Sequence, residues 1–85
     1  MGLDTVELVM EIETKFDIRV DDTIWAKTET VEEILEVVWE HCDKQIYMDK
    51  NLVAEQLKAL IIDCLGISEK NYGLDKSIVK DFGVD

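Results

Sequence analysis

The chain has 85 residues, of which 47% are hydrophobic, and its formal net charge at pH 7 is −11. A chain of this length forms one small domain and leaves no room for a second. So large a negative charge repels the phosphates of nucleic acids and of anionic membranes, and we expect neither as a partner. The surplus of carboxylates favours proteins with basic docking surfaces instead.

The cysteines and the first residues predict a cytoplasmic protein. Cys42 and Cys64 stand far apart, and neither lies in the spacing of a zinc or redox motif. We therefore expect buried or half-buried thiols on helix faces, with a disulfide or a redox role as the alternative. The start of the chain does not resemble a signal peptide, MGLDTV lacks the Ser or Thr of a myristoylation site, and no apolar run could cross a bilayer.

Apolar residues recur at helical spacing from residue 3 to residue 16. They are Val6, Val9, Met10, Ile12 and Phe16. Asp4, Glu7 and Glu11 gather on another face of the same segment. The spacing predicts an amphipathic helix with an acidic side. Solvation alone would explain such a side, and docking of a basic partner is the alternative.

The next stretch, DIRVDDTIWAKTET, loses the helical period. We expect a loop with one short helical turn around Asp22 to Ala26, in which Trp25 is a packing plug. Thr30 and Glu33 have the spacing of a capping box, which predicts the start of a helix. The apolar stripe behind it consists of Val31, Ile34, Leu35, Val38, Trp39 and Cys42.

A linker and a third stripe complete the predicted elements. Residues 44–50, KQIYMDK, have no helical period, and we expect a linker there. The stripe after the linker consists of Val53, Leu57, Leu60, Ile61 and Cys64. Gly66 stands where a left-handed residue closes a helix, and we expect Leu74, Ile78 and Phe82 to pin a long loop behind it. Because no segment alternates like a strand, these elements predict an all-α fold, a small antiparallel helical bundle.

The stretch LDTVELVM, at residues 3–10, resembles the acyl carrier proteins. In that family this string begins the second helix, directly after an Asp-Ser-Leu motif whose serine receives 4′-phosphopantetheine. The stretch VAEQLKALIIDCLGISEKNYGLDKSIVKDFGVD, at residues 53–85, resembles the family's first helix and long loop. The two halves cover nearly the whole chain in reversed order. The sequence is therefore similar to a circularly permuted carrier protein, opened at the phosphopantetheine site and closed by the linker.

A helical bundle permits such a reversed order. The resemblance implies that the family's last helix ends near the start of its first, and an extended linker of about seven residues spans on the order of 20 Å. A fragment of two tandem carrier repeats would give the same order of helices, and its halves could pair between chains as a swapped dimer. We expect the monomeric permuted fold, with the swapped dimer as the alternative.

The resemblance also implies a carrier that lacks its attachment point. The family's modified serine corresponds to Gly2, flanked in the family's order by Asp85 and Leu3, and glycine has no hydroxyl to modify. We expect the remaining serines, Ser68 and Ser77, to serve in turns and caps. With no serine at position 2, the chain is expected to carry no phosphopantetheine and no other cofactor. It is also expected to bind no metal and not to be an enzyme.

The same resemblance implies partners and an acyl pocket. Asp4, Glu7 and Glu11 match the family's recognition helix, whose charge attracts basic patches of carrier transferases and acyl synthases. Glu11 departs from the small residue usual at its position. The family shelters an acyl chain among positions that correspond to Val6, Val9, Met10, Ile12, Val38, Trp39, Leu57 and Ile61. Core packing explains these residues equally well, with an acyl-accessible cavity as the alternative.

The function expected from the resemblance is that of a carrier-like module of fatty acid or polyketide-type biosynthesis that bears no phosphopantetheine. The alternative from a different class is an acidic protein-interaction module, or a fragment that spans tandem carrier repeats.

Overall fold

The computed structural model describes the backbone of residues 3–77 and the side chains from residue 6 onward in that range. Its helices are α1 (Leu3–Phe16), α2 (Asp22–Lys27), α3 (Val31–His41) and α4 (Lys50–Leu65), followed by a 3-10 turn, η1 (Glu69–Asn71). Between residues 3 and 77 there is no strand, only an isolated bridge. The predicted all-α bundle is therefore confirmed.

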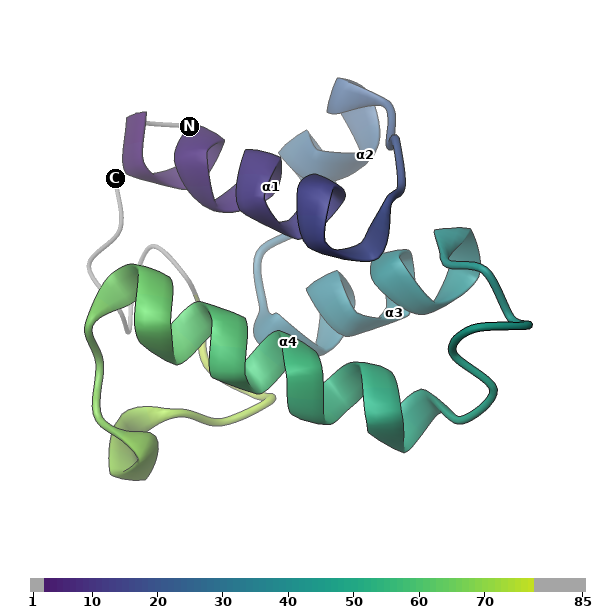
Figure 1. Ribbon diagram of the computed structural model, residues 1–85. Helices are drawn as coiled ribbons and strands as arrows, with labels where there is room; N and C mark the ends of the chain where they lie inside the picture. The colour runs from purple at the N-terminus through teal and green to yellow at the C-terminus, as the bar shows by residue number, and fades with distance from the viewer. Residues whose placement is uncertain (1–2, 78–85) are drawn as a thin grey trace.

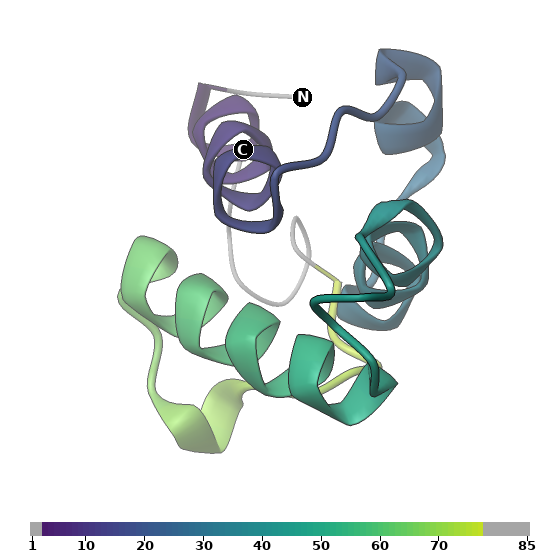
Figure 2. The same cartoon turned by 45° about the vertical axis from the view of Figure 1, so that its right-hand side comes forward.

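The helices α1 and α3 both pack on α4, which runs antiparallel to each of them (Figure 1). The short helix α2 lies on the side of α1 and α3 that faces away from α4, as the two views agree (Figure 2). This arrangement brings the first half of α1 beside the last turns of α4.

The end of α1 is an ordered turn built around Asp17, which has a left-handed backbone with φ 53°. The N–H of Asp17 donates to the Thr14 carbonyl at 3.4 Å, and that of Ile18 donates to the Glu13 carbonyl at 3.0 Å. These two bonds form a Schellman motif. The Glu13 carboxylate also accepts a bond of 2.9 Å from the Val20 N–H. As a result the chain reverses tightly and buries the side chains of Ile18 and Val20.

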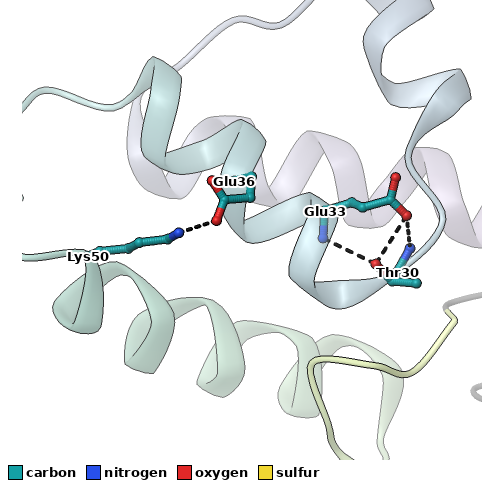
Figure 3. A network of polar contacts seen from close by, with 4 residues as sticks. All are labelled: Thr30, Glu33, Glu36 and Lys50. Carbon is teal, nitrogen blue, oxygen red and sulfur yellow. Dashed lines mark hydrogen bonds and ion pairs between the residues drawn. The ribbon is translucent and has the colours of Figure 1, made fainter.

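The helix α3 begins at the predicted capping box. The Glu33 N–H donates to the Thr30 hydroxyl oxygen at 3.2 Å, and the Glu33 carboxylate accepts from the Thr30 N–H at 3.2 Å (Figure 3). Each partner thus satisfies a backbone donor that the start of a helix leaves without an internal acceptor.

The tail loop, residues 66–77, supplies the acceptors for the two donors that the capping box does not reach. The Val31 N–H donates to the Lys76 carbonyl at 3.0 Å, and the Glu32 N–H donates to the Leu74 carbonyl at 2.9 Å. A segment far along the chain therefore completes the first turn of α3 through its main chain.

The way the tail loop is held differs from the expectation. Leu74 was predicted to pin the loop by its side chain, but that side chain is 44% exposed, so this prediction is wrong. Ile78 and Phe82, the other two residues predicted to pin the loop, lie outside the described residues. Ile67 and Tyr72 are partly buried against the core instead.

The helix α4 has the predicted stop signal and an earlier start. Gly66 closes it with φ 65°, and its N–H donates to the Ile62 carbonyl at 2.9 Å. At the other end the Asp49 carboxylate accepts from the Asn51 N–H at 2.9 Å. Lys50, the last residue of the expected linker, is therefore already the first residue of the helix.

The linker contacts both helices that it joins, because the Lys44 ammonium lies over the Trp39 ring of α3 and Asp49 caps α4, and it also contacts α1. The ring of Tyr47 meets the ring of Phe16 edge to face, with centroids 5.3 Å apart and planes at 60°. Just beyond the linker, Lys50 forms an ion pair with Glu36 of α3 (Figure 3). The turn between α3 and α4 is thus fixed from two sides.

The core fills the space between α1, α3 and α4. Its fully covered residues are Ile12, Val31, Val38, Val53, Leu57 and Ile61. Trp25 is 4% exposed and closes the core from α2, which agrees with its predicted role as a packing plug. Cys42 is buried as expected, and Leu8, which does not belong to the predicted apolar stripe, is buried as well.

Candidate docking site

The residues predicted to form the acyl pocket or core divide into three groups. Those with no exposed surface are Ile12, Val38, Leu57 and Ile61. Val9 and Trp39 are half-buried against them. Val6 and Met10 are exposed, at 44% and 61%, so their assignment to the core is wrong.

The packing of α1 explains why Val6 and Met10 point outward. The helix presents to the core the row formed by Leu8, Ile12 and Phe16, which are 3%, 0% and 2% exposed. Residues four apart lie one above the other on a helix, so this row fills a single narrow face. Val6 and Met10 form a second row outside that face.

The outer side of α1 therefore combines apolar and acidic side chains. Glu7 and Glu11, predicted as docking residues, are exposed and lie one turn apart. Val6 and Met10 lie one turn apart beside them, because residues three or four apart are neighbours on a helix surface. Asp4 belongs to the first turn of the same helix, and its side chain lies outside the described residues. We call Val6, Glu7, Met10 and Glu11 the α1 face.

A groove separates the α1 face from the end of α4. It is lined by Glu7, Leu8, Met10 and Glu11 from α1 and by Asp63 and Cys64 from α4. Asp63 and Cys64 were not predicted as site residues, because the sequence of α4 alone does not show which neighbouring helix they face. The antiparallel packing of α4 on α1 brings them to the site.

Cys64 is an exposed free thiol, so its expected burial is wrong, whereas Cys42 is a buried free thiol. The pKa of the Cys64 thiol is raised above its ordinary value because neighbouring atoms desolvate the sulfur. The carboxylates of Glu11, Asp63 and Glu7 raise it further. Three carboxylates from two helices thus act on one point of the groove.

A second groove lies at the opposite end of α1, around the turn that closes this helix. Its lining consists of Met10, Glu13, Thr14 and residues 17–22. Two of the acidic groups here are already engaged: Glu13 accepts from the Val20 N–H, and Asp21 accepts from the N–H and the hydroxyl of Thr23. Among residues 3–77 no three potential metal ligands come close enough together to hold an ion.

Both serines lie in the tail loop, and Ser68 makes no side-chain capping bond although it stands at the N-cap of η1. Ser68 is the residue before η1, and Ser77 pairs with Thr30 in the isolated bridge. Gly2, predicted to stand at the position of the modified serine, and Asp85, predicted to flank it, lie outside the described residues, as does the side chain of Leu3.

None of the described helices combines the length and the apolar character that crossing a bilayer requires. In comparisons with known proteins, no protein-family model matches the chain and no solved structure matches it. The function of the chain is therefore inferred from the geometry of α1 and α4 and from its sequence.

Proposed function

We propose that this chain is a carrier-like docking module, a permuted acidic bundle of the acyl carrier type that binds basic enzymes through the α1 face without bearing phosphopantetheine. The observation that carries the proposal is the exposure of Val6 and Met10 beside Glu7 and Glu11. Val6 and Met10 lie one turn apart, so they form a small continuous apolar surface beside the two carboxylates. A docking face combines apolar contact area with charges that steer the partner.

The order of the helices supports the permuted carrier arrangement. The stretch LDTVELVM, which resembles the start of the family's second helix, lies in α1. The stretch that resembles the family's first helix forms α4, which packs antiparallel to both α1 and α3 (Figure 1). A short linker is enough for this connection, because the end of α3 and the start of α4 lie at the same end of the bundle (Figure 1).

The absence of an attached arm is part of the proposal. Gly2 stands in the sequence where the family has its serine, and glycine offers no hydroxyl for phosphopantetheine. Ser68 directly precedes η1, and Ser77 lies in the isolated bridge with Thr30. We propose no step of acyl transfer on this chain.

Intact-mass measurement tests the missing attachment. The chain is incubated with coenzyme A and a carrier transferase, beside an ordinary carrier protein that shows the transferase to be active. We expect the ordinary carrier to gain phosphopantetheine and this chain to keep its mass. A gain of mass, mapped by peptide analysis to Ser68 or Ser77, would overturn this part of the proposal.

Calorimetric titration with the same transferase tests docking. Reversing both charges, with Glu7→Lys and Glu11→Lys, is expected to weaken binding roughly tenfold or more, because it removes attraction and adds repulsion. The matched control is the double variant Glu40→Lys, Glu55→Lys, an equal charge change at exposed positions of α3 and α4. Equal loss in the control would point to net charge instead of the α1 face and would overturn the assignment.

Two further measurements separate the alternatives. If the chain binds an acyl synthase although it has no serine at position 2, it is an interaction module. If only the Gly2→Ser variant binds, it is a disabled carrier. Light scattering at several concentrations tests the swapped dimer. We expect a monomer at every concentration, and a mass that rises toward twice that of the chain would favour the swapped dimer.

A further inference from the structure

We propose that the groove between α1 and α4 receives a basic amphipathic helix of the partner. An apolar side chain of that helix would rest on Met10, and a lysine or arginine would lie among Glu7, Glu11 and Asp63. This inference rests on the proposed function, because it extends the docking surface from the α1 face across to α4.

The apolar part of the groove favours a protein segment as its occupant. Leu8 is buried beneath the groove, whereas Met10 is 61% exposed at its lining. A methionine side chain is flexible and polarizable, and it adapts to differently shaped apolar partners. An amphipathic helix laid along two packed helices presents one apolar residue per turn to such a surface.

The charge of the groove specifies a basic helix. Within residues 3–77, Glu7, Glu11 and Asp63 make no ion pair, in contrast to Glu36 and Glu69, which pair with lysines. Among the residues that the structure describes, no lysine or arginine lines the groove. Three unpaired carboxylates from two helices therefore face one opening, and an ammonium or guanidinium group is the complementary charge.

The probe for this inference is a synthetic helical peptide of about 15 residues with lysines four apart and leucines on the same face. Its binding is followed by fluorescence anisotropy at low salt. A peptide of the same pattern with glutamates in place of lysines is the control for adhesion by the leucines alone. We expect the lysine peptide to bind and the glutamate peptide not to bind.

Variants of α4 test whether the groove, and not only the α1 face, holds the peptide. Asp63→Lys is expected to weaken binding roughly tenfold, because it places a like charge beside the peptide's lysines. Glu55→Lys, an equal change at an exposed position of α4 outside the groove, is the matched control and is expected to have a much smaller effect. Far-UV circular dichroism checks that both variants are folded.

Alkylation of Cys64 measures peptide binding in the groove a second way, without any variant. Because Cys42 is buried, alkylation of the folded chain reports on Cys64. A peptide in the groove should slow this alkylation several-fold at saturation. If Asp63→Lys binds like Glu55→Lys, or if alkylation is unchanged at saturation, the groove is not the site.

The outcomes also separate this inference from the function on which it rests. Suppose that the Glu7→Lys, Glu11→Lys variant loses transferase binding and that Asp63→Lys has no effect on peptide binding. The proposal of docking on the α1 face then stands, and the groove is refuted as the peptide site. If the α1 variant binds the transferase normally, the proposed function fails. Equal binding of the lysine and glutamate peptides would overturn the basic occupant.

Discussion

The rings of Phe16 and Tyr47 meet edge to face at 5.3 Å, and this contact joins the end of α1 to the linker between α3 and α4. Phe16 is almost completely buried, so the linker residue covers an edge of the core. The linker therefore contributes to the stability of the bundle as well as connecting two helices.

Removing the Tyr47 ring should destabilise the fold. We expect Tyr47→Ala to lower the free energy of unfolding by about 1–2 kcal/mol, because the aromatic pair and the cover over Phe16 are both lost. Tyr47→Phe keeps the ring and should change little. Urea unfolding followed by circular dichroism measures both. Ile46→Ala, at a neighbouring linker residue that is 65% exposed, is the control, and equal losses at the two positions would refute a specific role for Tyr47.

The capping box of α3 can be tested by Thr30→Ala. The substitution removes the oxygen that accepts from the Glu33 N–H, and such losses cost about 1 kcal/mol of stability. Thr28→Ala provides the comparison, since the Thr28 hydroxyl only donates to a carbonyl at the end of α2. Chemical denaturation should rank Thr30→Ala as the more destabilising of the two. The reverse order would contradict the cap.

Substitution of two residues that have a left-handed backbone conformation should change the free energy of unfolding in opposite directions. Asp17 has φ 53°, so Asp17→Gly is expected to raise the free energy of unfolding by about 0.5–1 kcal/mol. Gly66 has φ 65° and no atom near the position of an added Cβ, so Gly66→Ala should cost about 1 kcal/mol through backbone conformation alone. Thermal or urea unfolding measures both. Asp17→Asn separates the lost charge from the backbone effect, because asparagine tolerates this conformation.

The ion pair between Lys58 and Glu69 makes a prediction about titration. The Lys58 ammonium donates a 2.9 Å hydrogen bond to the Glu69 carboxylate, and this bond, followed by the attraction of the charge, lowers the pKa of Glu69. A lowered pKa in the folded state means that the contribution to stability is present above the ordinary pKa of glutamate. It is lost as the pH falls through the lowered value.

Carboxyl NMR titration of Lys58→Met checks this prediction. The pKa of Glu69 should rise toward its ordinary value, because the donor and its charge are gone. The pKa of Asp21 is lowered by hydrogen bonds from the backbone and the side chain of Thr23, so it should stay unchanged in the variant. A Glu69 pKa that does not move would show that Lys58 is not its partner in solution.

The net charge of −11 predicts a stability that depends on salt. Raising the ionic strength from about 0.01 M to 0.1 M shortens the range of charge interactions from about 30 Å to 10 Å. Self-repulsion between carboxylates is then screened, so we expect the urea midpoint to increase. Salt also weakens the exposed ion pairs, but such pairs contribute little to stability, so this loss is small. A midpoint independent of salt would contradict this account.

Local sequence signals predicted most of the elements of this fold. The bounds of α1, the capping box at Thr30 and the left-handed cap at Gly66 agree with the structure. Each depends on residues within a few positions of one another, so periodicity and cap chemistry are sufficient to predict it. The short helical turn around Trp25 was predicted for the same reason.

The orientation of α1 was harder to predict. Leu8 was left out of the predicted core, whereas Val6 and Met10 were included in it and are exposed. Several faces of this helix contain apolar residues, and periodicity does not say which of them meets a neighbour. The packing of α4 selects the row that contains Leu8, and the rejected row becomes part of the candidate site.

The sequence by itself determined the helical class of this protein, its acidic character and the limits of its helices, because these depend on composition and on short-range patterns. Only the tertiary structure decided that the tail loop caps α3 through the carbonyls of Leu74 and Lys76, and that Asp63 joins Glu7 and Glu11 around one groove. Both depend on contacts between residues far apart in the chain. Such contacts arise when antiparallel helices pack, and no pattern within one helix encodes them.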